Sequence, residues 1–325
     1  MKYILSLCLL LLLFCCKTGK KSESESVSIT TQEIKEMVSY LASDDLQGRY
    51  AGSEGIDKAA SFIENQFKSF GVKPYFKTYR DSFKIKNLDA FNVVGFIEGT
   101  DKYLKNEVII LGAHYDHIGY GDGIKKHGGK LTDLDVLANG ANDNASGTAA
   151  VLAVAKYFST KKNNKRSIMF ALFSAEEIGL FGSKHLAEKL KAENLNLYTM
   201  INFEMIGVSF KDRDYKAFIS GYELSNMALK INEYVDGNLL GFSDVSKKHN
   251  LFIRSDNYPF YQEFNSPCQT ISSCDLTNYD YYHHVDDETN ELDYEFMGSL
   301  INKTSLAIQK MSNTPTKEIV MYESE

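Results

Sequence analysis

Two uninterrupted apolar runs, Val108–Gly112 and Ile168–Phe173, constrain the fold of this chain more than any other feature. A strand that is apolar at every position is buried on both faces, as in a parallel sheet that helices cover on either side. Further strands are expected at Phe91–Ile97 and Met200–Ile206. The strands alternate with helices, which predicts an α/β fold, a three-layer sandwich whose mostly parallel central sheet is flanked by helices. Apolar residues with helical spacing place those helices at 31–41 (capped by Thr31), 56–70, 146–158, 180–190, 223–235 and 294–311.

Residues 30–312 contain no internal repeat and no linker-like stretch, so we expect a single domain there. The C-terminal tail, 313–325, lacks periodicity and is expected to fray. Hydrophobic residues make up 43% of the chain and charged residues 24%, which excludes a disordered protein. The formal net charge of −7 and the lack of a basic stripe argue against a nucleic-acid partner.

The N-terminal segment has the character of a bacterial lipoprotein signal. An apolar run, Tyr3–Phe14, follows a lysine and is too short to span a bilayer, but it suits a signal peptide. The run ends at Cys15 and Cys16 in a loose lipobox, so residues 1–16 are interpreted as a signal peptide with Cys16 favoured as the lipidated residue. An uncleaved anchor helix is the alternative. Polar residues then make 17–29 a flexible tether, and the protein is expected outside the cytoplasm, lipid-anchored at a periplasmic or surface membrane face.

Two cysteines, Cys268 and Cys274, lie outside the signal region. An oxidising compartment permits a disulfide between them. Their spacing equally suits two separate thiols, one on a strand and one in the loop after it, and the sequence leaves both alternatives open.

Polar side chains follow the buried strands at their carboxyl ends, where the sites of open α/β sheets form. His114 and Asp116 follow the first apolar run, and a carboxylate so placed can orient the ring of a metal-bound histidine. Asp143 lies just before an expected helix, and Glu176 and Glu177 follow the second apolar run. Taken singly, these residues have the alternative interpretations of a loop histidine, a helix cap and a solvated acidic loop.

Two more candidates lie further along the chain. Glu204 stands in an apolar run, and because a buried unpaired glutamate is rare, a cation is expected near it. His283 and His284 are adjacent, so in an extended segment only one of them would face a metal. Imidazole and carboxylate groups at successive strand ends suit zinc. Five ligand positions exceed the three of a single catalytic zinc, which predicts two zinc ions roughly 3.5–4 Å apart, bridged by one carboxylate.

The motifs around these residues resemble those of the M28 family of zinc aminopeptidases. The similarity runs from LASDDLQGR at 41–49 to Tyr294 and implies the zinc-exopeptidase (phosphorylase/hydrolase-like) type of α/β fold. The motifs are GAHYDHIG at 112–119, GANDNASG at 140–147, FSAEEIGLFGS at 173–183, INFEMIG at 201–207 and YYHHVDDETNELD at 281–293.

The resemblance implies a metal role for five side chains, with one bridging ligand and two further ligands for each zinc. Glu204 stands where the family more often has aspartate, and His283 is preferred to His284 because the next family acid, Asp287, lies four residues after it. The implied ligands are His114 and Glu204 for the first zinc, Glu177 and His283 for the second, and Asp143 as the bridge.

The same resemblance implies that Glu176 is the general base, that Tyr282 steadies the oxyanion, and that Asp116 orients the ring of His114. A further segment, RSDNYPF at 254–260, matches a family loop on the substrate side, with Asn257 in place of a histidine.

The function expected from the resemblance is the release of N-terminal residues from peptides. A glutaminyl cyclase-like acyltransferase with one zinc, a carboxypeptidase or dipeptidase of the same fold, and a non-catalytic binding protein are the alternatives. The sequence indicates neither the preferred N-terminal residue nor the oligomeric state.

Overall fold

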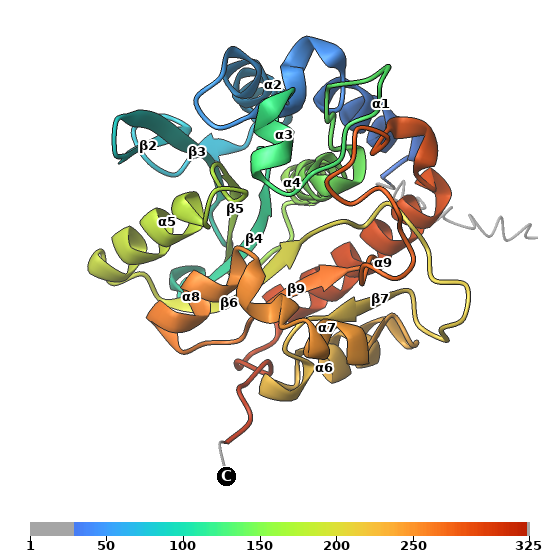
Figure 1. Ribbon diagram of the computed structural model, residues 1–325. Coiled ribbons are helices and arrows are strands. Elements are labelled where there is room, and N and C mark those ends of the chain that lie inside the picture. The colour runs from blue at the N-terminus through green and yellow to red at the C-terminus, as the bar shows by residue number, and fades with distance from the viewer. Residues whose placement is uncertain (1–28, 324–325) are drawn as a thin grey trace, which may run out of the picture.

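The central feature of the computed structural model, which describes residues 29–323, is one mixed β-sheet with helices on both faces (Figure 1). Four parallel strands form its middle, in the order β5, β4, β6 and β9. They span Ser167–Phe173 (β5), Val108–His114 (β4), Leu197–Phe203 (β6) and Cys268–Ser272 (β9). Every residue of these four strands is buried, as the apolar runs predicted for β4 and β5.

Shorter or antiparallel strands complete both edges of the sheet. On one side, β3 (Leu88–Ile97) runs antiparallel to β5 and pairs with β2 (Arg80–Ile85) and β1 (Lys73–Pro74). On the other side, β7 (Ala217–Ile219) pairs antiparallel with β9 and parallel with β8 (Leu240–Gly241).

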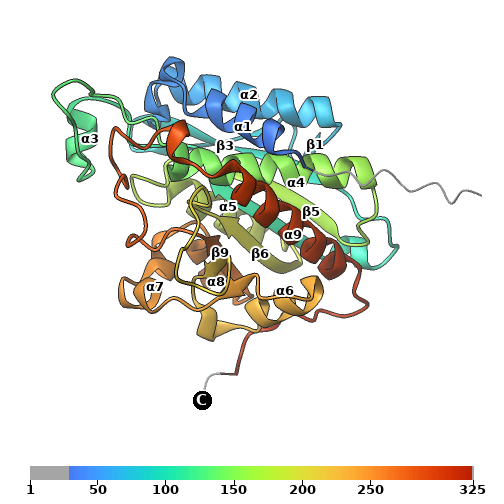
Figure 2. The ribbon, with the colours of Figure 1, turned by 90° about the vertical axis from the view of Figure 1, so that its right-hand side faces the viewer.

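Helices cover the two faces and produce three layers (Figure 2). One face carries α1 (Thr31–Leu41), α2 (Glu54–Phe70), α4 (Gly147–Lys161) and α9 (Tyr294–Asn313), with α6 (Met227–Val235) packed against α9. The other face carries α5 (Phe181–Ala192) and α8 (Asn257–Phe264). Two short helices, α3 (Asp122–Lys126) and α7 (Asp244–Lys248), lie outside these layers.

The side chains of β5 show how the layers are built. Ile168, Phe170 and Leu172 belong to the core on the α4 side, whereas Met169 and Phe173 belong to the core on the α5 side. Alternate residues of a strand point to opposite faces, so one apolar run supplies both cores. The predicted three-layer α/β sandwich is confirmed.

Local details differ from the expectations in small ways. The N-cap of α1 is Thr30 rather than Thr31, and its side chain accepts a hydrogen bond from the backbone of Glu33 in a capping box. Strand β6 ends at Phe203 rather than Ile206, because the chain leaves the sheet toward Met205, whose φ is 49°.

The sequence analysis expected the C-terminal tail to fray, but the tail residues that the structure describes pack against the domain. Ile319 is only 2% exposed, and the hydroxyl of Tyr198 accepts hydrogen bonds from the backbone nitrogens of Glu318 and Ile319. A single buried side chain gives no periodicity, which is why the sequence showed no sign of this packing.

The cysteines lie as two separate buried thiols, Cys268 on β9 and Cys274 in the loop after it, so the disulfide alternative is wrong for this structure. The signal peptide 1–16 and nearly all of the tether 17–29 lie outside the described residues. The exception is Ile29, which is buried and exchanges hydrogen bonds with the side chain of Asn302 on α9. Within residues 29–323, no helix combines the length and apolar character needed to cross a bilayer.

Candidate metal centre

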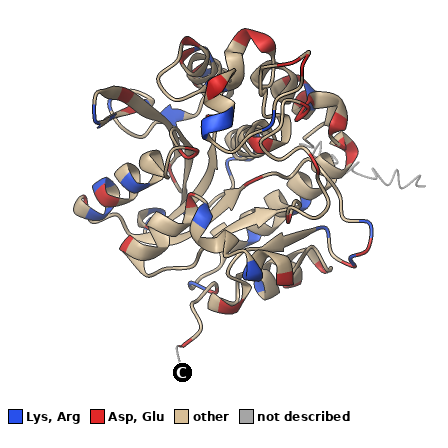
Figure 3. Cartoon of the chain, viewed as in Figure 1, with Lys and Arg blue, Asp and Glu red and all other residues tan. Residues whose placement is uncertain are grey.

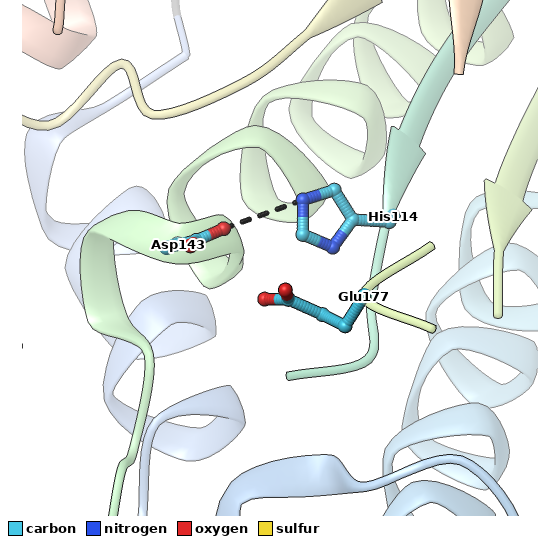
Figure 4. Close-up of side chains that lie close together, drawn as sticks. All are labelled: His114, Asp143 and Glu177. Carbon is cyan, nitrogen blue, oxygen red and sulfur yellow. Dashed lines mark ion pairs between the residues drawn. The ribbon is translucent and has the colours of Figure 1, made fainter. Parts of the chain in front are cut away.

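The predicted ligands gather at the carboxyl edge of the parallel strands. His114 is the last residue of β4, Glu177 lies in the turn after β5, and Asp143 lies in the helical turn Ala141–Ser146 that leads into α4. Donor atoms of these three side chains all lie within 4.8 Å of one another (Figure 4). Parallel strands end at the same edge, so residues distant in sequence converge there.

Asp143 stands between two histidines. Its Oδ1 is 3.4 Å from Nε2 of His114, and its Oδ2 is 3.5 Å from Nε2 of His283. Nε2 of His283 is also 3.0 Å from Oε2 of Glu177. The two oxygens of one carboxylate therefore face two different donor groups, which is the arrangement that a bridging ligand requires.

A glycine makes room for this turn. Gly140 has φ of 60°, and a Cβ there would lie 2.5 Å from the ring of His117 and 2.3 Å from the carbonyl oxygen of Asp143. A larger residue would be strained and would displace both.

Glu204 lies just beyond β6 and lines the same pocket as Asp143, Glu176 and Glu177. Ser255 donates a hydrogen bond to its Oε2. Burial raises the pKa of Glu204 to about 7. Glu204 is not among the three most tightly grouped side chains, but it shares their pocket.

Asp116 contacts His114 differently from the expectation. Nδ1 of His114 is 3.2 Å from the backbone oxygen of Asp116 and 3.8 Å from its carboxylate. The carboxylate instead accepts hydrogen bonds from the backbone nitrogens of Glu176 and Glu177, at 3.2 and 3.3 Å. Asp116 thus fixes the turn that carries two candidate residues, as well as lying beside the histidine ring.

His117 is a site residue that the sequence analysis missed. It is fully buried, and its Nδ1 is 2.9 Å from Oε1 of Glu177 and 3.9 Å from Oδ2 of Asp143. Its Nε2 has no hydrogen-bond partner among the described residues. The signal in the sequence is the second histidine of the motif GAHYDHIG, His117, which directly follows Asp116.

The two adjacent glutamates have opposite electrostatic environments. Burial raises the pKa of Glu176 well above its usual value. Burial also acts on Glu177, but hydrogen bonds from His117 and His283 prevail and hold its pKa well below the usual value. A raised pKa makes a carboxylate a stronger proton acceptor, and a firmly ionised carboxylate suits a metal ligand.

A buried carboxylate supports the turn around Asp143. Asp287 accepts hydrogen bonds from the backbone nitrogens of Asn142 and Asp143, at 2.7 and 3.0 Å. The hydroxyl of Tyr279 donates to the same carboxylate at 2.6 Å.

Arg49, also fully buried, binds four backbone carbonyls around the site. It donates to the oxygens of Leu41, Tyr115, Asn139 and Gly140, at distances between 2.5 and 2.9 Å. It thereby joins the N-terminal loop to the segments that carry the candidate ligands.

Of the two adjacent histidines, His283 faces the site, whereas Nδ1 of His284 accepts a hydrogen bond from the backbone of Asp286. Tyr282 lines the pocket, and its ring stacks on that of His283 at a centroid distance of 4.1 Å. Burial raises the pKa of its phenol, so the hydroxyl remains a proton donor.

The segment 254–260, in which α8 begins at Asn257, contributes Arg254 and Ser255 to the lining of the pocket. Asn257 does not reach the pocket. It is buried, donates to the backbone oxygen of Phe252 and accepts a hydrogen bond from Thr270. Its role in this structure is to hold the start of α8 against β9.

Comparisons of the sequence with known proteins find peptidases. The model of peptidase family M28 matches residues 92–307. A probable zinc metalloprotease of Pyrenophora teres f. teres is 26% identical over 196 residues, which are 56% of this chain and 37% of that protein. Leucine aminopeptidase 2 of Arthroderma otae is 32% identical over 147 residues, 45% of this chain and 26% of that protein. The matched regions thus span 26% to 37% of the length of these curated relatives.

Solved structures share the fold. The aminopeptidase from Aneurinibacillus sp. strain AM-1 superposes with a TM-score of 0.65 at 18% identity, covering 91% of this chain and 97% of that one. Porphyromonas gingivalis glutaminyl cyclase superposes with a TM-score of 0.68 at 15% identity, covering 87% and 98%. At such identities the likeness shows the fold alone.

Proposed function

The chain belongs to peptidase family M28, and on that premise we propose that it is a zinc-dependent aminopeptidase that releases N-terminal residues from peptides. The observation that carries the proposal is the position of Asp143 between His114 on one side and His283 with Glu177 on the other. We infer that these side chains and Glu204 hold two zinc ions.

The donor set fits zinc chemically. Histidine nitrogens and carboxylate oxygens are its usual ligands, and a cluster of buried acids needs cationic compensation. The burial that raises the pKa of Glu204 to about 7 is a cost that a bound cation would offset. Zinc held there would lower the pKa of a water molecule and polarise the substrate carbonyl.

The remaining chemistry falls to the chain's own side chains. Glu176 lies next to the ligand Glu177 and lines the same pocket, and its ionised carboxylate can accept a proton. It takes the proton of the attacking water and passes it to the amine that leaves. The hydroxyl of Tyr282 donates to the oxygen on which negative charge develops.

The pocket beside the centre suits an apolar N-terminal residue. Its lining includes the side chains of Met205, Phe218, Leu251 and Leu276. We therefore propose peptides with a free N-terminus and an apolar first residue as substrates.

The test combines a metal count with a substrate panel. We expect about two zinc ions per purified chain, and cleavage of leucine anilides but not of N-blocked peptides. Glu176→Gln should keep its zinc and lose roughly 100- to 10,000-fold in kcat, whereas Glu188→Gln, on the exposed side of α5, should change little.

Three results would contradict parts of this proposal. One zinc per chain, together with ammonia release from N-terminal glutamine, would favour the cyclase chemistry. Cleavage of blocked peptides from their C-terminus would indicate a carboxypeptidase. Undiminished hydrolysis by the Glu176→Gln protein would remove the assigned base.

We also propose that the chain is attached outside the cytoplasm of a bacterium through lipid on Cys16. The support is the apolar run Tyr3–Phe14 that ends at Cys15 and Cys16. Labelling with a fatty-acid analogue in cells should mark the wild-type chain and Cys15→Ala but not Cys16→Ala, and the reverse pattern would assign Cys15.

A further inference from the structure

The pocket of the candidate centre has a cation at its edge that the proposed reaction does not use. Arg254 lines this pocket together with the carboxylates of Asp143, Glu176, Glu177 and Glu204. Its side chain is exposed. In Figure 3, lysines and arginines lie scattered among acidic residues over the visible elements and form no extended basic surface.

Arg254 differs from the other arginines of the chain. Arg80, Arg166 and Arg213 each form an ion pair with an acid. Arg49 is buried on backbone carbonyls near the carboxylates of the centre. Among residues 29–323, Arg254 has no acidic partner, and the side-chain hydrogen bond recorded for it goes to the hydroxyl of Tyr282 at 3.4 Å. Its remaining guanidinium donors are available to a ligand.

A short chain of contacts links this guanidinium to the metal centre. Arg254 reaches Tyr282, the ring of Tyr282 stacks on His283, and His283 contacts Glu177 at 3.0 Å. Nη2 of Arg254 lies 3.4 Å from the hydroxyl of Tyr282, so an acid bound by the guanidinium would lie near the group proposed to steady the reacting carbonyl oxygen.

We propose that Arg254 is a specificity-determining residue that binds a carboxylate of the substrate at the outer end of the pocket. The inference rests on the proposed peptidase function and names the substrate class of that same site. A guanidinium offers paired donors that match a carboxylate. Because Arg254 lines the pocket and has no acidic partner among residues 29–323, a substrate with a carboxylate beyond the cleaved bond meets a positive charge there. The carboxylate comes either from the C-terminus of a short peptide or from an acidic side chain after the cleaved bond.

Matched substrate pairs separate the two sources. Leu-Ala is compared with Leu-Ala-amide for the terminal carboxylate, and Leu-Asp-amide with Leu-Asn-amide for the side chain. We expect at least one acid to be preferred by about tenfold in kcat/KM, with the preference weakening at high salt. Arg254→Met should raise KM for the preferred acid by about tenfold, leave its kcat and the neutral partner nearly unchanged, and abolish the preference. Arg254→Lys should restore part of it.

The control is Lys73→Met, which removes one exposed positive charge on β1, away from this pocket. It should leave both pairs unchanged. Equal hydrolysis of both members of each pair by the wild-type protein would overturn the inference and leave the peptidase proposal standing. An equal fall in kcat for acids and neutral partners in Arg254→Met would also overturn it, because Arg254 would then act only by positioning Tyr282. Hydrolysis of none of the four peptides would contradict the proposed function itself.

Discussion

Replacing Arg49 with methionine should destabilise the folded protein by about 4 kcal/mol. The guanidinium is fully buried and donates to four backbone carbonyls, those of Leu41, Tyr115, Asn139 and Gly140. A buried acceptor left without its donor costs about 1–3 kcal/mol. Relief from burying a cation offsets part of that cost, so we take the lower end of the range for each carbonyl.

Urea unfolding followed by circular dichroism measures this change, and a loss of about 4 kcal/mol would lower Tm by roughly 10 °C. The free energy of unfolding of Arg49→Lys should lie between those of the wild-type and Arg49→Met proteins, because an ammonium has fewer donors in a different geometry. The control is Arg80→Met, which removes partly exposed ion pairs to Asp57 and Glu64 and should cost about 1 kcal/mol or less.

Arg49→Met should also weaken zinc binding by about 10- to 100-fold, because the carbonyls of Tyr115 and Gly140 belong to the segments that hold the candidate ligands. Competition with a fluorescent chelator, without urea and at a temperature well below Tm, measures the zinc affinity separately from the stability. If Arg49→Met unfolds within about 1 kcal/mol of the wild-type protein, the four hydrogen bonds do not carry the role assigned to them.

Three further outcomes are expected. His117→Ala should weaken binding of one zinc ion by about 10- to 100-fold in a two-site titration, because His117 hydrogen-bonds Glu177; equal loss at both sites would contradict this. After chelation, stability should fall as pH rises from about 4.5 to 7, since burial raises the pKa of Glu204 to about 7 and the folded state then binds more protons than the unfolded chain; urea unfolding at stepped pH would contradict this if stability rose. Deleting residues 314–325 should cost about 2–4 kcal/mol through the loss of a buried isoleucine and two backbone hydrogen bonds, and unchanged unfolding would show that this packing is dispensable.

The sequence predicted three of the four middle strands, β4, β5 and β6, from their apolar runs. It missed β9, because Gln269, Thr270 and Ser272 interrupt the apolar residues of that strand although all of them are buried. It missed β2, whose residues alternate between buried and exposed positions over Arg80–Ile85, and β7 and β8, which are too short to show a pattern. Short edge strands are fixed by their neighbours rather than by their own composition. The sequence analysis also missed α8, whose eight residues, Asn257–Phe264, are too few to show a clear helical spacing.

At the site, residues that end a strand could be predicted, since a polar group after a buried run is conspicuous. Residues whose contacts join distant parts of the chain could not be predicted. Arg49 reaches Gly140 across 91 positions of the chain, and no local pattern connects them. His117 was hidden inside a motif that already had an interpretation.

The side chains of the centre are drawn from His114 to His283, and β9, the last strand in sequence, is inserted between β6 and β7. Pairings between such distant segments form late, after long loops have closed. A polypeptide still emerging from the ribosome lacks the histidine that closes the constellation. The candidate centre therefore stays incomplete until His283 has been synthesised and its segment has packed against the carboxyl ends of the parallel strands.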